Sequence, residues 1–385
     1  MDHPFTFPKG FLSCAKNVGI KDETLDFTII YSEVRAAAAA MFTQNQFCGA
    51  PVVVGKEHIK DGFLQAFVIN SKNANVATGQ QGIEAVHQVI GAAAAELSVN
   101  PEDILPSSTG VIGVPLPVEK ILTGIPGLKN ELKEDGLKES AEAIMTTDTF
   151  PKFRKAKAGN ATVCAIAKGS GMIEPNMATM LSYIVTDAEV APENLQQMLK
   201  RAVDISFNMV SVDGDTSTSD TVAIMANGLA GPVDLEEFEQ VLTGMLISLA
   251  KDLARDGEGA TKLVEVNVSG ANGEAEAKKM VKAIINSPLV KTAIFGADPN
   301  WGRIISTVGN ADFAIDPSKV SIAFGELIVF KDGEPALPNQ DELANYLQGN
   351  EITISIVLGT GPGSATGWGC DLSYEYVRIN GEYTT

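Results

Sequence analysis

Strand-like and helical segments alternate along the whole of this 385-residue chain, and this alternation limits the folds open to it. Short apolar runs bounded by turn residues predict strands, and these runs are 52–54, 63–70, 162–167, 221–225, 263–268, 352–358 and 372–379. Apolar residues spaced three and four apart predict helices, and these lie over 83–97, after Pro192 and over 235–254. The mixture predicts an α/β or α+β fold.

A soft domain boundary falls in the stretch SGANGEAEA at 269–277, which is rich in Gly, Ala and Glu and lies between an expected strand and an expected helix. We therefore expect a larger domain over residues 1–275 and a smaller C-terminal α/β domain over 276–385.

Composition indicates a soluble globular protein, with 45% hydrophobic and 20% charged residues. The net charge of −19 argues against nucleic acid as a partner, because phosphate contacts need clustered Lys and Arg. No run of about 20 apolar residues predicts a membrane span, and the N-terminus lacks the pattern of a signal peptide. We expect a cytoplasmic location. The four cysteines are scattered, so we expect no zinc site or disulfide framework.

One segment, residues 168–181, reads KGSGMIEPNMATML and places Thr179 directly after Ala178. A threonine within a chain is a poor nucleophile. If the Ala178–Thr179 bond is cut, the α-amine of Thr179 becomes free, titrates at about 7.7–8.0 and can take the hydroxyl proton. The chain has only three histidines, which favours such a self-contained nucleophile. The alternative is a threonine that caps a turn after Asn176.

The segment SSTGVIG at 107–113 contains two candidate donors for a developing oxyanion, Thr109 and Gly110. Glycine allows a backbone N–H to approach a ligand closely, and the threonine hydroxyl adds a second donor. The alternative is an ordinary polar turn after Pro106.

These motifs resemble the ornithine acetyltransferase family (glutamate N-acetyltransferase, of the cyclic arginine pathway), and the resemblance covers nearly the whole chain. It rests on the two segments above and on further ordered motifs: TTDT at 146–149, DGDTSTSD at 213–220, ARDGEGATK at 254–262, NSPLVKTAIFGADPNWGRII at 286–305 and WGCDLSYEYVRIN at 368–380. Two positions depart from the family pattern, since Lys72 stands where Gly is common and Ser219 where Asn is usual.

The resemblance implies a layered αββα sandwich of the N-terminal-nucleophile type and self-cleavage at Ala178–Thr179 into fragments of 178 and 207 residues. It implies that Thr109 and Gly110 form the oxyanion hole. The implied substrate-binding residues are Thr146, Lys168, Thr179, Glu258, Asn380 and Thr385. Thr147 lies next to Thr146, so this assignment is open by one residue. For Lys168 and Glu258 the alternative is a solvated surface charge.

The implied activity is transfer of acetyl from N-acetylornithine to glutamate by a ping-pong route through acetyl-Thr179. Some family members also use acetyl-CoA, which makes it a candidate second donor. We expect no metal or nucleotide cofactor and an α2β2 heterotetramer of the two fragments. One alternative is an N-terminal-nucleophile aminopeptidase or amidase, which would prefer water as acceptor. Another is a metabolite-binding protein, which would stay uncut.

Overall fold

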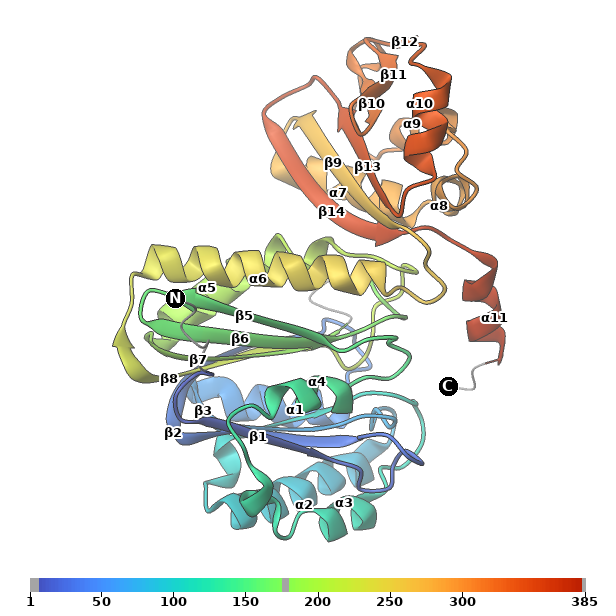
Figure 1. The fold of residues 1–385 in the computed structure, drawn as a ribbon. Helices are drawn as coiled ribbons and strands as arrows, with labels where there is room; N and C mark the ends of the chain where they lie inside the picture. Colours follow the sequence, from blue (N-terminus) through green and yellow to red (C-terminus); the bar gives the residue numbers. More distant parts are fainter. Residues whose placement is uncertain (1–6, 175–179, 383–385) are drawn as a thin grey trace.

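The computed structural model describes residues 7–174 and 180–382, and in these residues it contains two β-sheets (Figure 1). The strands of the first sheet are β1 Phe11–Lys16, β2 Phe27–Phe42, β3 Phe63–Asn70, β4 Ile104–Ser108, β5 Lys152–Ala158, β6 Ala161–Lys168, β7 Leu181–Glu189 and β8 Thr221–Pro232. Those of the second are β9 Leu263–Ala271, β10 Ser321–Phe324, β11 Leu327–Lys331, β12 Glu334–Pro335, β13 Glu351–Val357 and β14 Gly363–Cys370. The α-helices are α1 Ala50–His58, α2 Gly79–Leu97, α3 Val118–Gly124, α4 Leu137–Ala143, α5 Pro192–Asp204, α6 Leu235–Arg255, α7 Glu274–Asn286, α8 Pro288–Phe295, α9 Trp301–Gly309, α10 Gln340–Leu347 and α11 Tyr374–Glu382.

The first sheet turns back on itself at the long strand β2. The strand order is β4-β3-β2-β8-β7-β6-β5, with β1 also paired to β2. The first part of β2 pairs with β1 and β3, and its last part, from Ala37 to Phe42, pairs with β8. Its register against β3 shifts between Tyr31 and Ala36, and such an irregularity lets a strand bend and twist more strongly. The two halves of the sheet therefore face one another.

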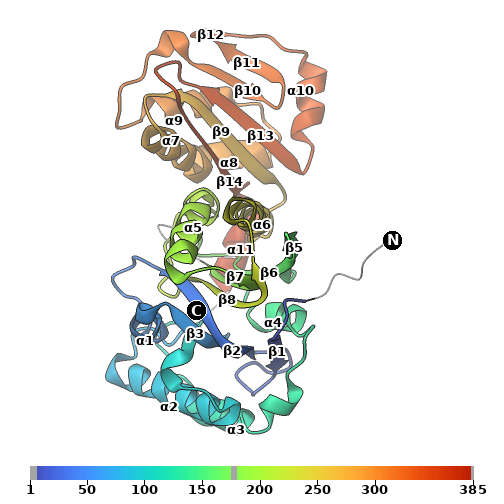
Figure 2. The same cartoon turned by 90° about the vertical axis from the view of Figure 1, so that its left-hand side faces the viewer.

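Alternating side chains of these strands fill three core layers. Phe67 and Ile69 of β3 share one buried cluster with Tyr183 and Val185 of β7, and the rings of Phe67 and Tyr183 lie 5.1 Å apart. The residues between them belong to two outer clusters that also contain helix residues. Figure 2 shows these helices on both sides of the sandwich. Helices α1 to α3 cover the β2–β3 half, and α5 and α6 cover the β6–β8 half. This arrangement confirms the predicted αββα layering.

The second sheet has the order β12-β11-β10-β13-β9-β14, with α7 packed against β9 and β14. Strand β9 pairs in parallel with β13 and antiparallel with β14. Since β9 ends at Ala271, the second sheet already includes residues before the expected boundary at 275/276. The expected linker does lie between a strand and a helix, because α7 begins at Glu274.

Two predicted strands are wrong. Residues 52–54 lie in α1, which begins after Gly49 with Pro51 in its first turn, a position that proline favours. Residues 372–379 lie largely in α11. The other predicted strands and the three predicted helices are present, with small shifts at their ends.

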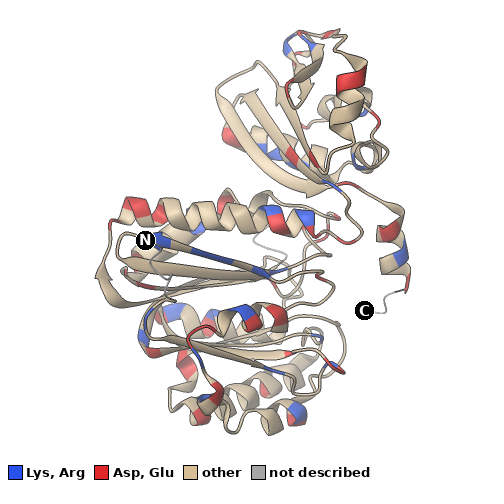
Figure 3. Cartoon of the chain, in the orientation of Figure 1, with Lys and Arg blue, Asp and Glu red and all other residues tan. Residues whose placement is uncertain are grey.

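Charged residues of both signs lie mostly on helices and loops, and β5 carries a basic stripe (Figure 3). None of the described helices combines the length and the apolar character that crossing a membrane requires.

Candidate active site

A pocket in the first sheet region gathers most of the residues that the sequence singled out. It is lined by Thr109, Gly110, Thr146, Lys168, Glu258 and Asn380, together with Thr147, Met180 and residues 217–220. These residues come from strand ends and the loops beside them: Thr109 follows β4, Lys168 ends β6, Met180 precedes β7 and Asp220 precedes β8. Segments far apart in the sequence thus meet where the strands of both halves of the sheet begin or end.

The Thr109–Gly110 turn is held against the residues that follow β3. Gly110 has φ +132°, and a Cβ there would lie 2.2 Å from the backbone carbon of Lys72, so only glycine fits. The Thr109 N–H donates to the carbonyl of Asn70 at 3.1 Å. Within the described ranges 7–174 and 180–382, the Gly110 N–H has no hydrogen-bond acceptor.

Lys168 lies beside this turn and is almost fully buried, with 8% of its surface exposed. Its ammonium donates to Thr109 Oγ1 at 3.3 Å, which leaves the hydroxyl proton of Thr109 free to donate elsewhere. Burial lowers the pKa of Lys168, and the nearby carboxylate of Asp148 partly opposes this shift. The surface-charge alternative for Lys168 is wrong, because the side chain is inside the protein.

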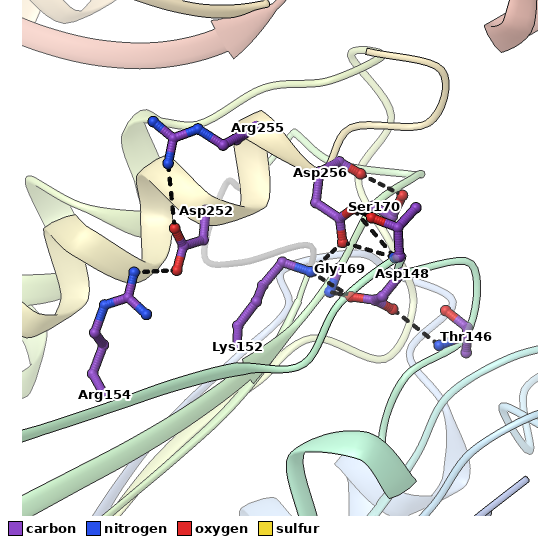
Figure 4. A network of polar contacts seen from close by, with 10 residues as sticks. Thr146, Asp148, Lys152, Arg154, Gly169, Ser170, Asp252, Arg255 and Asp256 are labelled. Carbon is purple, nitrogen blue, oxygen red and sulfur yellow. Dashed lines mark hydrogen bonds and ion pairs between the residues drawn. The ribbon is translucent and has the colours of Figure 1, made fainter. Parts of the chain in front are cut away.

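A buried ionic cluster that the sequence analysis did not identify lies beside Gly169, the residue after Lys168 (Figure 4). Lys152 donates to Asp148 at 2.8 Å and to Asp256 at 2.5 Å, and all three side chains are buried. Asp148 also accepts the N–H of Thr146 at 2.9 Å and that of Gly169 at 2.6 Å.

The cluster keeps Asp148 ionised. Burial alone would raise the pKa of this carboxyl, but the ammonium groups of Lys152 and Lys168 and the hydrogen bonds lower it to about 2. Both acids lie in motifs noted above, Asp148 in TTDT and Asp256 in ARDGEGATK. No local sequence pattern shows that these two acids share Lys152, because Asp256 is distant from both in the chain.

Glu258 and Asn380 meet at the other side of the pocket. Asn380 Nδ2 donates to Glu258 Oε2 at 2.8 Å, and the Glu258 N–H donates to the carbonyl of Ser170 at 3.0 Å. A Cβ on Gly171 would lie 2.4 Å from the Glu258 carboxyl carbon, so the carboxylate rests against this glycine. Asn380 belongs to helix α11, which follows the second sheet and runs back toward the first (Figure 1).

Three predicted site residues, Ala178, Thr179 and Thr385, lie outside the described residues. The residue that follows Thr179 is described. Met180 lines the pocket, and its carbonyl accepts the Thr221 N–H at 3.1 Å. Thr146 lines the pocket with Thr147, so the structure leaves the choice between them open.

The sequence analysis also missed Asp220, which lines the pocket next to Met180 and is 1% exposed. Its signal was present: it is the last residue of DGDTSTSD and directly precedes an apolar strand, so its side chain lies at a strand end like that of Lys168. Lys72, whose backbone lies against Gly110, has φ +75°, a region that glycine adopts more easily.

Comparison with known proteins assigns the chain to a family. The model of the ArgJ family matches residues 13–385. The arginine biosynthesis bifunctional protein ArgJ 2 of Clostridium acetobutylicum is 51% identical over 382 residues, which are 99% of this chain and 98% of that protein. The glutamate N-acetyltransferase Oat2 of Streptomyces clavuligerus is 44% identical over 98% of each chain. A crystal structure of the arginine biosynthesis bifunctional protein ArgJ of Bacillus halodurans, 44% identical, matches 53% of this chain and 100% of the solved chain with a TM-score of 0.52. These matches confirm the resemblance that the motifs indicate, and the chain belongs to the ArgJ family.

Proposed function

We propose that this ArgJ family member is an acetyltransferase of arginine biosynthesis that moves acetyl from N-acetylornithine to glutamate through an ester on Thr179. The observation that carries the proposal is the pocket: an oxyanion turn, a buried lysine and a carboxylate–amide pair lie around the residue that follows Thr179. Each of these groups matches a part of the reaction.

In the first half-reaction, the α-amine of Thr179 takes the hydroxyl proton, and Oγ attacks the acetyl carbonyl carbon of N-acetylornithine. The Gly110 N–H and the Thr109 hydroxyl donate to the oxyanion. The ammonium of Lys168 at Thr109 Oγ1 polarises this hydroxyl and strengthens it as a donor. When the C–N bond breaks, the departing ornithine nitrogen receives the proton, and the acetyl ester remains on Thr179.

In the second half-reaction, the amine of glutamate attacks the ester, releases N-acetylglutamate and restores the threonine hydroxyl. Two charged groups orient the amino acids. Lys168 binds the α-carboxylate as a point charge, and Glu258, held by Asn380, binds the distal ammonium of ornithine. Thr146, with Thr147 beside it, and Thr385 complete the proposed substrate site.

The proposed nucleophile requires cleavage between Ala178 and Thr179. The Bacillus halodurans chain supports this step, because its whole length corresponds to 53% of this chain. A fragment that starts at Thr179 has 207 of the 385 residues, which is also just over half. The solved relative therefore has the length expected of the second cleavage product.

Four further features are part of the proposal. The two fragments stay together as an α2β2 heterotetramer, the enzyme works in the cytoplasm, and the transfer needs no metal or nucleotide cofactor. Acetyl-CoA is a second donor for glutamate acetylation.

The test compares wild type, Thr179→Ala and Thr179→Ser on a denaturing gel with mass spectrometry and in acetyl transfer. Wild type should give two fragments and form N-acetylglutamate. Thr179→Ala should stay uncut and inactive, and Thr179→Ser, which keeps a hydroxyl, should cut and retain activity. Ornithine release that does not depend on glutamate would instead identify a hydrolase of the aminopeptidase or amidase type. An uncut wild type that transfers acetyl would refute the mechanism.

A further inference from the structure

Cleavage of the chain needs a base that the acetyl transfer does not. Once Thr179 is N-terminal, its own amine accepts the hydroxyl proton. In the uncut chain the same nitrogen is part of an amide and has no basic lone pair. Another group near Thr179 must therefore take the proton when its hydroxyl attacks the carbonyl of Ala178.

Strand pairing brings Asp220 close to Met180, the residue that follows Thr179 in the sequence. β7 and β8 are parallel neighbours, with Leu181 opposite Thr221. The Thr221 N–H donates to the carbonyl of Met180 at 3.1 Å. Asp220 thus directly precedes β8, and Met180, the residue after Thr179, directly precedes β7 at the same end of the sheet. Both residues line the pocket that also contains the oxyanion turn.

The carboxyl of Asp220 has an unused hydrogen-bonding position. The side chain is 1% exposed, and its Oδ2 has no hydrogen-bond partner in the described part of the chain. Buried polar atoms without a partner are rare and costly, so one beside a reaction site calls for a ligand or a role. An oxygen that can accept a proton supplies such a role.

The surroundings of Asp220 make it a stronger base than an ordinary carboxylate. Burial raises its pKa well above the usual value, while the hydroxyls of Ser217 and Thr43, the charge of Lys168 and the N–H of Met180 oppose the shift. A base whose pKa lies nearer to neutral pH takes a proton from a hydroxyl more readily.

The other polar groups of the pocket are less suited to this step. Lys168 donates to Thr109, and Glu258 accepts from Asn380. Asp148, which does not line this pocket, has a pKa lowered to about 2 and is bound by Lys152, so it is a weak base. Neither His58 nor His87 lines the pocket.

We propose that Asp220 is the acid–base residue of chain cleavage, an inference that rests on the proposed function of Thr179. The Asp220 carboxylate takes the proton from Thr179 Oγ as Oγ bonds to the carbonyl carbon of Ala178, and Thr109 and Gly110 hold the oxyanion. The intermediate collapses with rupture of the C–N bond, and Asp220 returns the proton to the departing nitrogen of Thr179. Water then hydrolyses the ester, which frees the Ala178 carboxylate and the Thr179 hydroxyl.

The test follows cleavage of the full chain after cell-free synthesis, by denaturing gel and mass spectrometry, in wild type, Asp220→Asn, Asp220→Glu and Asp187→Asn. Asp187 is the matched control, because it is a 2% exposed aspartate near the far end of β7 that accepts the N–H groups of Thr162 and Lys9. Thermal unfolding and circular dichroism of each product report whether it has folded.

Asp220→Asn should fold and cleave more slowly than wild type by a factor of about 10²–10⁴, the usual contribution of a general acid–base group. Asp220→Glu should cleave faster than Asp220→Asn, and Asp187→Asn should match wild type. The wild-type cleavage rate should rise with pH as the carboxyl of Asp220 ionises, and the rate of Asp220→Asn should lose this dependence.

Cleavage of Asp220→Asn at the wild-type rate would overturn the inference. So would a slow Asp220→Asn with an unchanged pH profile, or an Asp220→Glu no faster than Asp220→Asn, because both indicate a structural role. These results are distinct from failure of the proposed function, which would appear as acetyl transfer by uncut Thr179→Ala.

Discussion

Replacement of Thr109 by valine tests the oxyanion turn most sharply. Valine keeps the size and branching of threonine and removes only the hydroxyl. Thr109 is 7% exposed, so water has little room to take the place of the lost group. The transition state loses one of two donors, and we expect kcat to fall by about 10²–10³, or about 2.7–4 kcal/mol. KM should change little, because the ground-state carbonyl carries no full negative charge.

The substitution also leaves the buried ammonium of Lys168 without the oxygen that lies 3.3 Å away. Loss of one partner of a buried hydrogen bond costs about 1–3 kcal/mol of stability, which urea unfolding would measure. Thr162→Val is the control, since Thr162 is a buried threonine on the same strand as Lys168 and its hydroxyl accepts from Lys157 at 2.7 Å. Its kcat should equal that of wild type.

The assay is steady-state acetyl transfer from N-acetylornithine to glutamate, normalised to the cleaved fraction measured on a gel, because the same donors serve cleavage. Thr109→Ser, which restores a hydroxyl, should recover most of the rate. The oxyanion assignment would be refuted by a Thr109→Val enzyme with unchanged kcat, or by one in which only KM rises.

Three further predictions concern the ionic groups around the pocket. Lys152→Met leaves Asp148 and Asp256 buried without their shared cation and should lower the free energy of unfolding by about 3–5 kcal/mol, as measured in urea. Folding lowers the pKa of Asp148 from 3.8 to about 2, so this carboxylate adds about 2 kcal/mol to the free energy of unfolding. The contribution is fully present above the pKa of the unfolded state and is lost as pH falls through the pKa of the folded state. Tm measured against pH should show this loss of stability in acid for wild type and not for Asp148→Asn. Glu258→Gln should raise KM for N-acetylornithine by about 10–100-fold, the value of a charge-assisted hydrogen bond, with a smaller effect on KM for glutamate; equal effects on both would contradict the assigned contact.

Local patterns predicted five of the fourteen strands and three of the eleven α-helices of the described residues, and with them the mixed α/β character of the fold. Helix α6 shows apolar residues at helical spacing and begins after Asp234, whose side chain accepts the N–H of Glu237. Strand β14, with the sequence GSATGWGC, was not predicted because its glycines are poor strand formers. A Cβ on Gly367 would lie 2.5 Å from Val281 of α7, so glycine at this position lets β14 pack closely against that helix.

Tertiary context also explains two further departures, β2 and residues 52–54. The alanines of β2 favour a helix by intrinsic propensity, yet β2 is a strand because β3 and β8 pair with it on its two sides. The run at 52–54 looks like a strand when its neighbours are ignored, but Pro51 starts a helix in which Val52 and Val54 are buried and Val53 is exposed.

The candidate site likewise contains residues that sequence motifs indicate and residues whose roles appear only in the folded structure. The motifs shared with the family indicated Thr109, Lys168 and Glu258, and all three line the pocket. The roles of Asp148 and Asp220 depend on burial and on partners far away in the chain, which no local pattern reports. Lys152, for example, joins Asp148 to an acid more than one hundred residues further along.

The most direct measurement of the central claim is peptide mapping by mass spectrometry after the purified protein is mixed with N-acetylornithine and quenched in acid. The account predicts a fragment whose first residue is Thr179 and which carries one acetyl group on the hydroxyl of that residue, and the group should disappear when glutamate is added before the quench. Acetyl transfer by a protein whose Ala178–Thr179 bond is intact, or an acetyl group on any other side chain, would contradict it.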